Sequence, residues 1–90
     1  MPYIEKEDRI KYLAPILELK THIKAHSRED LSGQLNFIIT TLINEAYSDA
    51  PLKYKDLNAI VGMLECCKQE YYRRVVSPYE DSKIKENGDL

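Results

Sequence analysis

Apolar residues recur along most of this chain at intervals of three and four, the spacing of one face of an α-helix. No segment alternates apolar and polar residues for long, so strands are not expected. The pattern predicts an all-α protein, a small helical bundle in which residues 1–90 form a single domain.

The first half of the chain predicts three helices. A short helix is expected over residues 5–13, and Pro15 then ends or bends it, because proline removes a backbone donor and clashes inside a helix. A second helix is expected over residues 15–25, with proline in its first turn. A third follows a polar connector, begins with Ser32 as its N-cap and stops near Tyr47. Its apolar stripe consists of Leu35, Ile38, Ile39, Leu42 and Ile43.

The longest predicted helix covers about residues 54–76. One face holds Leu57, Ile60, Val61, Leu64, Cys67, Tyr71 and Val75. A helix of this length spans roughly 34 Å. Its partners within the chain are too short to cover that length, so part of the helix is expected to meet another subunit.

A short C-terminal helix is predicted over about residues 78–86. Ser77 and Glu80 have the spacing of a capping box, with Pro78 at the first helical position. Gly88 stands where a C-terminal cap belongs. Together these features predict a break between this helix and the long one.

Composition, net charge and length limit the classes of function that fit this chain. The chain is 43% hydrophobic and 31% charged, which is typical of a folded globular protein. A net charge of −2 argues against a dedicated duplex-DNA binder, so nucleic acid is not an expected partner. A chain this short forms a marginal core alone, which favours a homo-oligomer.

Cys66 and Cys67 are adjacent, so an intramolecular bridge between them is not expected. Reduced cysteines fit a cytoplasmic setting. No apolar run approaches the length of a membrane span, and the N-terminus lacks the pattern of a signal peptide.

The residues around the end of the long helix form the candidate ligand-binding site. This site consists of Tyr72, Arg73, Arg74, Tyr79, Glu80 and Asp81. Arginines beside tyrosines are typical of surfaces that grip phosphate and stack a base. In the alternative interpretation Tyr71 fills the core while the arginines pair with Glu70, Glu80 or Asp81. An interface role is a third reading.

Catalytic and metal chemistry find little support. His22 and His26 are four residues apart, but no glutamate base lies between them and no third ligand is suggested. No nucleophile motif or glycine-rich phosphate loop is present. We therefore expect no enzymatic activity, no catalytic residues, no metal and no cofactor.

The C-terminal half also supports a family resemblance. It contains Leu64-Glu65-Cys66, Glu70-Tyr71-Tyr72-Arg73-Arg74, Pro78-Tyr79-Glu80-Asp81, Lys83-Ile84 and Glu86-Asn87-Gly88-Asp89. With the Met-Pro-Tyr-Ile start and Leu35-Asn36-Phe37, this resembles a family of short proteins of unknown function from bacteria, archaea and tailed phages. Tyr71 replaces the family's phenylalanine, and Leu90 its valine.

The resemblance implies a phage or prokaryotic cytoplasm, where small all-α proteins often sequester a ligand or a host protein. Two functional hypotheses follow. The first is a helical interaction protein that works as a homo-oligomer, and the second is a binder of a small anionic ligand such as a nucleotide signal. A helix-turn-helix mode of nucleic-acid binding is disfavoured, because no helix has a clustered basic face.

Overall fold

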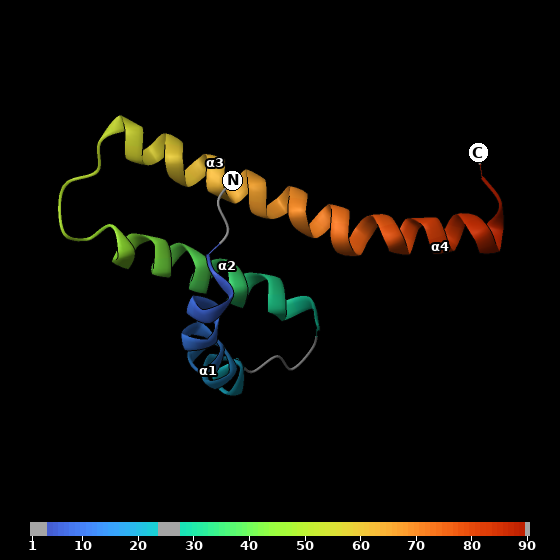
Figure 1. Ribbon diagram of the computed structural model, residues 1–90, viewed down its shortest axis with the longest axis horizontal. Helices are drawn as coiled ribbons and strands as arrows, with labels where there is room; N and C mark the ends of the chain where they lie inside the picture. The colour runs from blue at the N-terminus through green and yellow to red at the C-terminus, as the bar shows by residue number, and fades with distance from the viewer. Residues whose placement is uncertain (1–3, 24–27, 90) are drawn as a thin grey trace. The chain divides into compact units, whose positions relative to one another are not determined.

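The computed structural model describes residues 4–23 and 28–89, and every regular element within them is helical (Figure 1). The predicted all-α class is therefore confirmed. The chain divides into two compact units, Met1–Pro51 and Leu52–Leu90. The single domain expected for residues 1–90 stays a prediction.

The first unit contains α1, Lys6–His22, and α2, Arg28–Ala46. The predicted break at Pro15 is wrong, because α1 passes through this residue without interruption. A proline inside a helix costs about 3 kcal/mol. The residues on both sides of Pro15 favour helix, and this preference outweighs the local cost.

The start of α2 also differs from the prediction. Ser32 lies inside the helix, one turn after its beginning, so it is not the N-cap. Glu29 and Asp30 occupy the first turn, where carboxylates interact favourably with the positive end of the helix dipole. The polar stretch read as a connector is thus partly helical, and residues 24–27 lie outside the described ranges.

The second unit is one continuous helix with three parts. These are α3, Tyr54–Tyr71, a π-helical turn, Tyr72–Val76, and α4, Ser77–Asn87. Figure 1 shows them as an uninterrupted ribbon, labelled α3 and α4. The long helix therefore begins where predicted, but its predicted end near residue 76 is wrong.

The π-turn explains why the helix does not stop at Pro78. Proline cannot donate a backbone hydrogen bond, and its ring clashes with the carbonyl four residues earlier. In the π-turn the Ser77 N–H donates to the Tyr72 carbonyl five residues earlier. The wider turn makes room for the proline ring, and the chain stays helical.

The predicted capping box at Ser77 is wrong for the same reason. Val76 and Ser77 both have α-helical backbone angles, and the Val76 side chain caps nothing. At the true start of α3, the Lys53 N–H donates to Asp56 Oδ2 over 2.9 Å.

The predicted C-terminal cap is confirmed. Gly88 has φ 84° and its N–H donates to the Ile84 carbonyl over 2.8 Å. Glycine adopts this left-handed φ without the steric cost that other residues meet.

Exposure is the main physical feature of both units. No residue in the described ranges is buried. Along α3, Val61 is 66% exposed and Tyr71 is 62% exposed, so Tyr71 does not fill a core as one interpretation supposed. An enclosed bundle core stays a prediction.

Candidate functional site

The π-turn joins two residues of the candidate site that an ordinary helix would keep apart. The Tyr72 hydroxyl donates to Glu80 Oε1 over 2.8 Å, eight residues further along the helix. Eight residues rise about 12 Å in an α-helix and end on a different side of it. Two long side chains and the altered twist of the π-turn close that gap.

This contact changes the acidity of the phenol. The hydrogen bond to Glu80, followed by the charge of the same carboxylate, raises the pKa of Tyr72 above its usual range. The protonated phenol is the donor, so the contact holds the hydroxyl in its neutral form. Tyr72 is therefore the hydrogen-bond donor in this contact.

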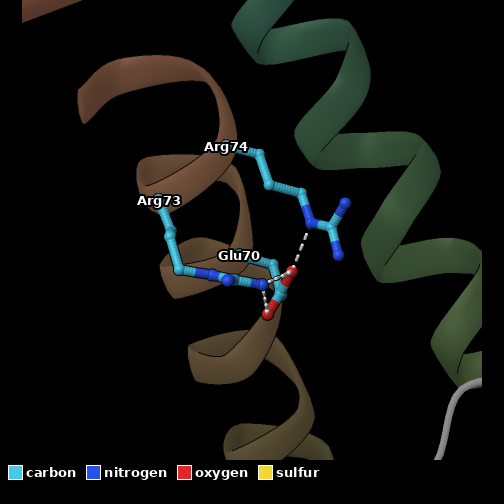
Figure 2. Close-up of polar contacts among 3 residues, drawn as sticks. All are labelled: Glu70, Arg73 and Arg74. Carbon is cyan, nitrogen blue, oxygen red and sulfur yellow. Dashed lines mark hydrogen bonds and ion pairs between the residues drawn. The ribbon is translucent and has the colours of Figure 1, made fainter. Parts of the chain in front are cut away.

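Both arginines of the candidate site engage one carboxylate, that of Glu70 (Figure 2). Arg73 Nη2 lies 3.1 Å from Glu70 Oε1, and Arg74 Nε lies 2.7 Å from Oε2. The alternative interpretation paired these arginines with Glu70, Glu80 or Asp81, and in the structure both of them pair with Glu70. The Arg73 side chain is 68% exposed, whereas that of Glu70 is 30% exposed.

A polar hollow of about 460 Å³ lies along this part of the helix. Its lining residues are Glu65, Lys68, Gln69, Glu70, Tyr72, Arg73 and Ser77. Gln69 donates to Glu65, and this bond, together with the nearby Lys68, lowers the pKa of the Glu65 carboxyl. The hollow is thus lined by side chains that already interact with one another.

The charge of this lining is balanced. Glu65 and Glu70 contribute two negative charges, and Lys68 and Arg73 contribute two positive charges. An anion placed here would compete with carboxylates already held by these cations. The arrangement therefore fits a ligand with both signs of charge better than a phosphate alone.

The structure brings together part of the predicted site. Tyr72 and Arg73 line the polar hollow, and Glu80 joins them through its bond from Tyr72. Tyr79 lies apart from this lining, with Lys83 Nζ 5.6 Å from its ring centroid. Arg74 and Asp81 are not lining residues either.

Sequence reasoning missed a second hollow, which lies in the first unit. Its volume is about 480 Å³. It is lined by Leu19, His22, Ile23, Gly33, Gln34, Phe37 and Ile38. The apolar spacing of Leu19, in α1, and Ile23, directly after it, was visible in the sequence, but its pairing with one side of α2 requires tertiary structure.

Across residues 4–23 and 28–89, no three His, Cys, Asp or Glu side chains are grouped to hold a metal ion. Cys66 and Cys67 are both free thiols. None of the helices described here is long and apolar enough to cross a membrane.

Comparison with known proteins assigns the chain to a family. Neither the curated proteins nor the solved structures give a match. One family model matches residues 1–90, and its description is "Domain of unknown function (DUF6899)". Since that match covers the whole chain, the protein belongs to the DUF6899 family.

Proposed function

We propose that this protein is a small interaction protein that works as a homo-oligomer and has no catalytic activity. The observation that carries the proposal is an apolar stripe along α3 and the π-turn, in which Ile60 is half-buried and the other members are exposed. We define this stripe as Leu57, Ile60, Val61, Leu64, Cys67, Tyr71 and Val75.

Physical chemistry explains why the stripe favours a partner. Leu57, Val61 and Leu64 are all exposed, although they recur on one face of a continuous helix. Contiguous exposed apolar surface marks interaction sites on proteins. Most helical stability in proteins comes from packing such a face against another element. A second copy supplies a matching face without any further gene product.

Analytical ultracentrifugation of the full chain tests this proposal. The monomer mass is 10.5 kDa. We expect a species of at least twice that mass, and its fraction should rise between about 1 and 100 µM as mass action requires. A monomer throughout that range contradicts the proposal.

A second candidate is the binding of a small anionic ligand, such as a nucleotide signal. Its support is that Lys68, Tyr72 and the exposed Arg73 all line the polar hollow. Arginine and lysine bind phosphate, and a tyrosine ring stacks on a base. The two carboxylates in the same lining weigh against it.

Thermal-shift measurements with inorganic phosphate, mononucleotides and cyclic dinucleotides test the second candidate. A ligand at 100 times its dissociation constant stabilises the folded state by about 2.7 kcal/mol. Arg73→Ala should abolish the shift, and Arg74→Ala should retain it, because only the first of these side chains lines the hollow. No shift across the panel, or equal loss in both variants, contradicts this candidate.

The setting we propose is the cytoplasm of a prokaryote or a cell infected by a tailed phage, with a host protein as a further partner class. The family resemblance of the Tyr-Arg-Arg and Pro-Tyr-Glu-Asp segments supports this origin. The two free, adjacent cysteines are compatible with a reducing compartment.

A further inference from the structure

Pro78 interrupts the backbone ladder where the π-turn meets α4. In an α-helix the Arg74 carbonyl would accept a hydrogen bond from residue 78, but proline has no N–H to donate. The Ser77 N–H instead donates to the Tyr72 carbonyl, five residues earlier. A bond of this kind adds one residue to a single turn of the helix. All residues after the turn are therefore displaced by one position around the helix axis.

This displacement decides which side chain of α4 lies on the same face as Tyr72. At about 3.6 residues per turn, a residue seven positions further on lies about 20° from the starting direction, and a residue eight positions further on lies about 80° away. An unbroken α-helix would thus align Tyr79 with Tyr72. The π-turn adds one position, so Glu80 is aligned instead, and it accepts the Tyr72 hydroxyl over 2.8 Å.

We propose that Pro78 and the π-turn act as a register device, which fixes the rotation of α4 and keeps Glu80 on the face of Tyr72. We call the observed arrangement the π register. In the alternative α register the π-turn becomes α-helix, and α4 rotates by about 100°. The proline ring opposes the α register, because it would clash with the Arg74 carbonyl. The bond to Glu80 also opposes it, because the rotation would separate the two side chains.

Tyr79 lies where the π register predicts. Its side chain is exposed and is not part of the lining of the polar hollow, which includes Tyr72. The nearest recorded partner of its ring is Lys83, whose Nζ is 5.6 Å from the ring centroid. Lys83 is four residues further along α4, so this contact lies within α4 and does not cross the π-turn.

The register also decides which chemistry the Tyr72 face presents. In the π register the hydroxyl of Tyr72 is engaged by a carboxylate, and Lys68 lines the same hollow, so the face is polar. In the α register two tyrosine rings would share one face, about 10 Å apart along the axis. Stacking of a base on both rings is available only there. A ligand shifts α4 between the registers only by the difference between its affinities for them.

Pro78→Ala in the full chain, studied by NMR, is the first test. Alanine supplies the missing N–H, so we expect the α register, with loss of the nuclear Overhauser contact from the Tyr72 ring to Glu80 and gain of one to Tyr79. The pKa of Tyr72, which Glu80 raises in the natural chain, should fall towards its usual value. If Pro78→Ala retains the contact to Glu80 and the raised pKa, Pro78 does not hold the register and the inference is overturned.

An exchange of two neighbouring residues separates register from other effects of the proline. Tyr79→Glu and Glu80→Tyr, added to Pro78→Ala, place a carboxylate seven residues after Tyr72, where the α register aligns it. We expect the contact and the raised pKa to return. The same exchange in a chain that keeps Pro78 is the matched control, and it should abolish both. Equal results in the two backgrounds contradict the inference.

Deletion of Val75 from the Pro78→Ala chain is a second route to the same end. It also brings Tyr72 and Glu80 to a spacing of seven, so the contact should return in an unbroken α-helix. Cα chemical shifts verify that each variant stays helical across the junction. A helical deletion variant that lacks the contact overturns the inference. These readouts report on register within the helix, so they are separate from the test of the homo-oligomer.

Discussion

The two parts of the long helix differ in what satisfies their side chains. In α3, Leu57, Val61 and Leu64 form an exposed apolar face with no partner within the helix itself. In the part from Tyr72 onward, side chains contact one another, as Tyr72 does with Glu80 and Lys83 with Glu86. Under the proposed function, the first part is stabilised by association with a partner, and the second is stabilised by local contacts.

This comparison implies that equivalent substitutions should act differently in the two parts. A substitution in the apolar stripe should alter the constant for association between copies of the chain. A change beyond Tyr72 should alter helix stability and leave association nearly unchanged.

The largest effect is expected from Leu64→Lys. This change places an ammonium group at the centre of the stripe, where pairing would remove it from water. We expect association to weaken at least about 100-fold, equivalent to about 2.7 kcal/mol. Ile84→Lys is the matched control in α4, and it should weaken association less than about threefold. Ultracentrifugation measures both, and equal effects would show that the stripe is not special.

The next largest effect is expected from Pro78→Ala. Proline in a helix interior costs about 3 kcal/mol relative to alanine, and the π-turn already relieves part of that cost. We expect the free energy of unfolding to rise by about 1–2 kcal/mol, with the π-turn converting to α-helix. Chemical denaturation followed by circular dichroism measures this change. A loss of stability would mean that the π-turn has a cause other than proline.

A smaller effect is expected from Glu70→Ala, which removes the acceptor shared by Arg73 and Arg74. Each helical ion pair contributes about 0.3–0.5 kcal/mol, so the combined loss should be about 1 kcal/mol or less. Raising the salt concentration should reduce the difference from the natural chain. Glu70 lies in α3 but outside the stripe, so association should stay unchanged, and a shift in the association constant would show that the interface extends beyond the stripe.

The smallest effect is expected from Tyr72→Phe, and it should depend on pH. The pKa of Tyr72 is raised in the folded state by the bond to Glu80, so this contact stabilises the fold fully below the unfolded value of about 10. The stabilisation is lost as pH rises through the raised folded pKa.

Thermal unfolding at several pH values therefore should show a difference between the natural chain and Tyr72→Phe that disappears in strong alkali. Tyr54→Phe is the control, because that side chain lies at the exposed start of α3. The same pH dependence in both variants would show that the Tyr72 contact does not form.

Hydrophobic spacing alone was sufficient to predict the helical class and the start of the long helix at Tyr54. The cap at Gly88 and the pair between Glu70 and Arg74 also followed from local rules. These features depend on residues within one or two turns, which the sequence displays directly.

The two failures at proline residues share a physical cause. Pro15 and Pro78 were read as helix breaks, but in both places the flanking helix continues through the proline. Whether a proline ends a helix depends on the sum of preferences around it, and a π-turn offers a third outcome. The bond from Tyr72 to Glu80 spans that turn, so sequence spacing alone did not indicate it.

Hydrogen exchange of the α3 backbone at two concentrations tests the central claim most directly. If a second copy covers the stripe, amides near Leu64 should exchange markedly more slowly at high concentration than at low concentration, while those near Ile84 should change little. If protection near Leu64 is the same at both concentrations, the stripe is not covered by a second copy, and the account of this protein as a self-associating interaction module is wrong.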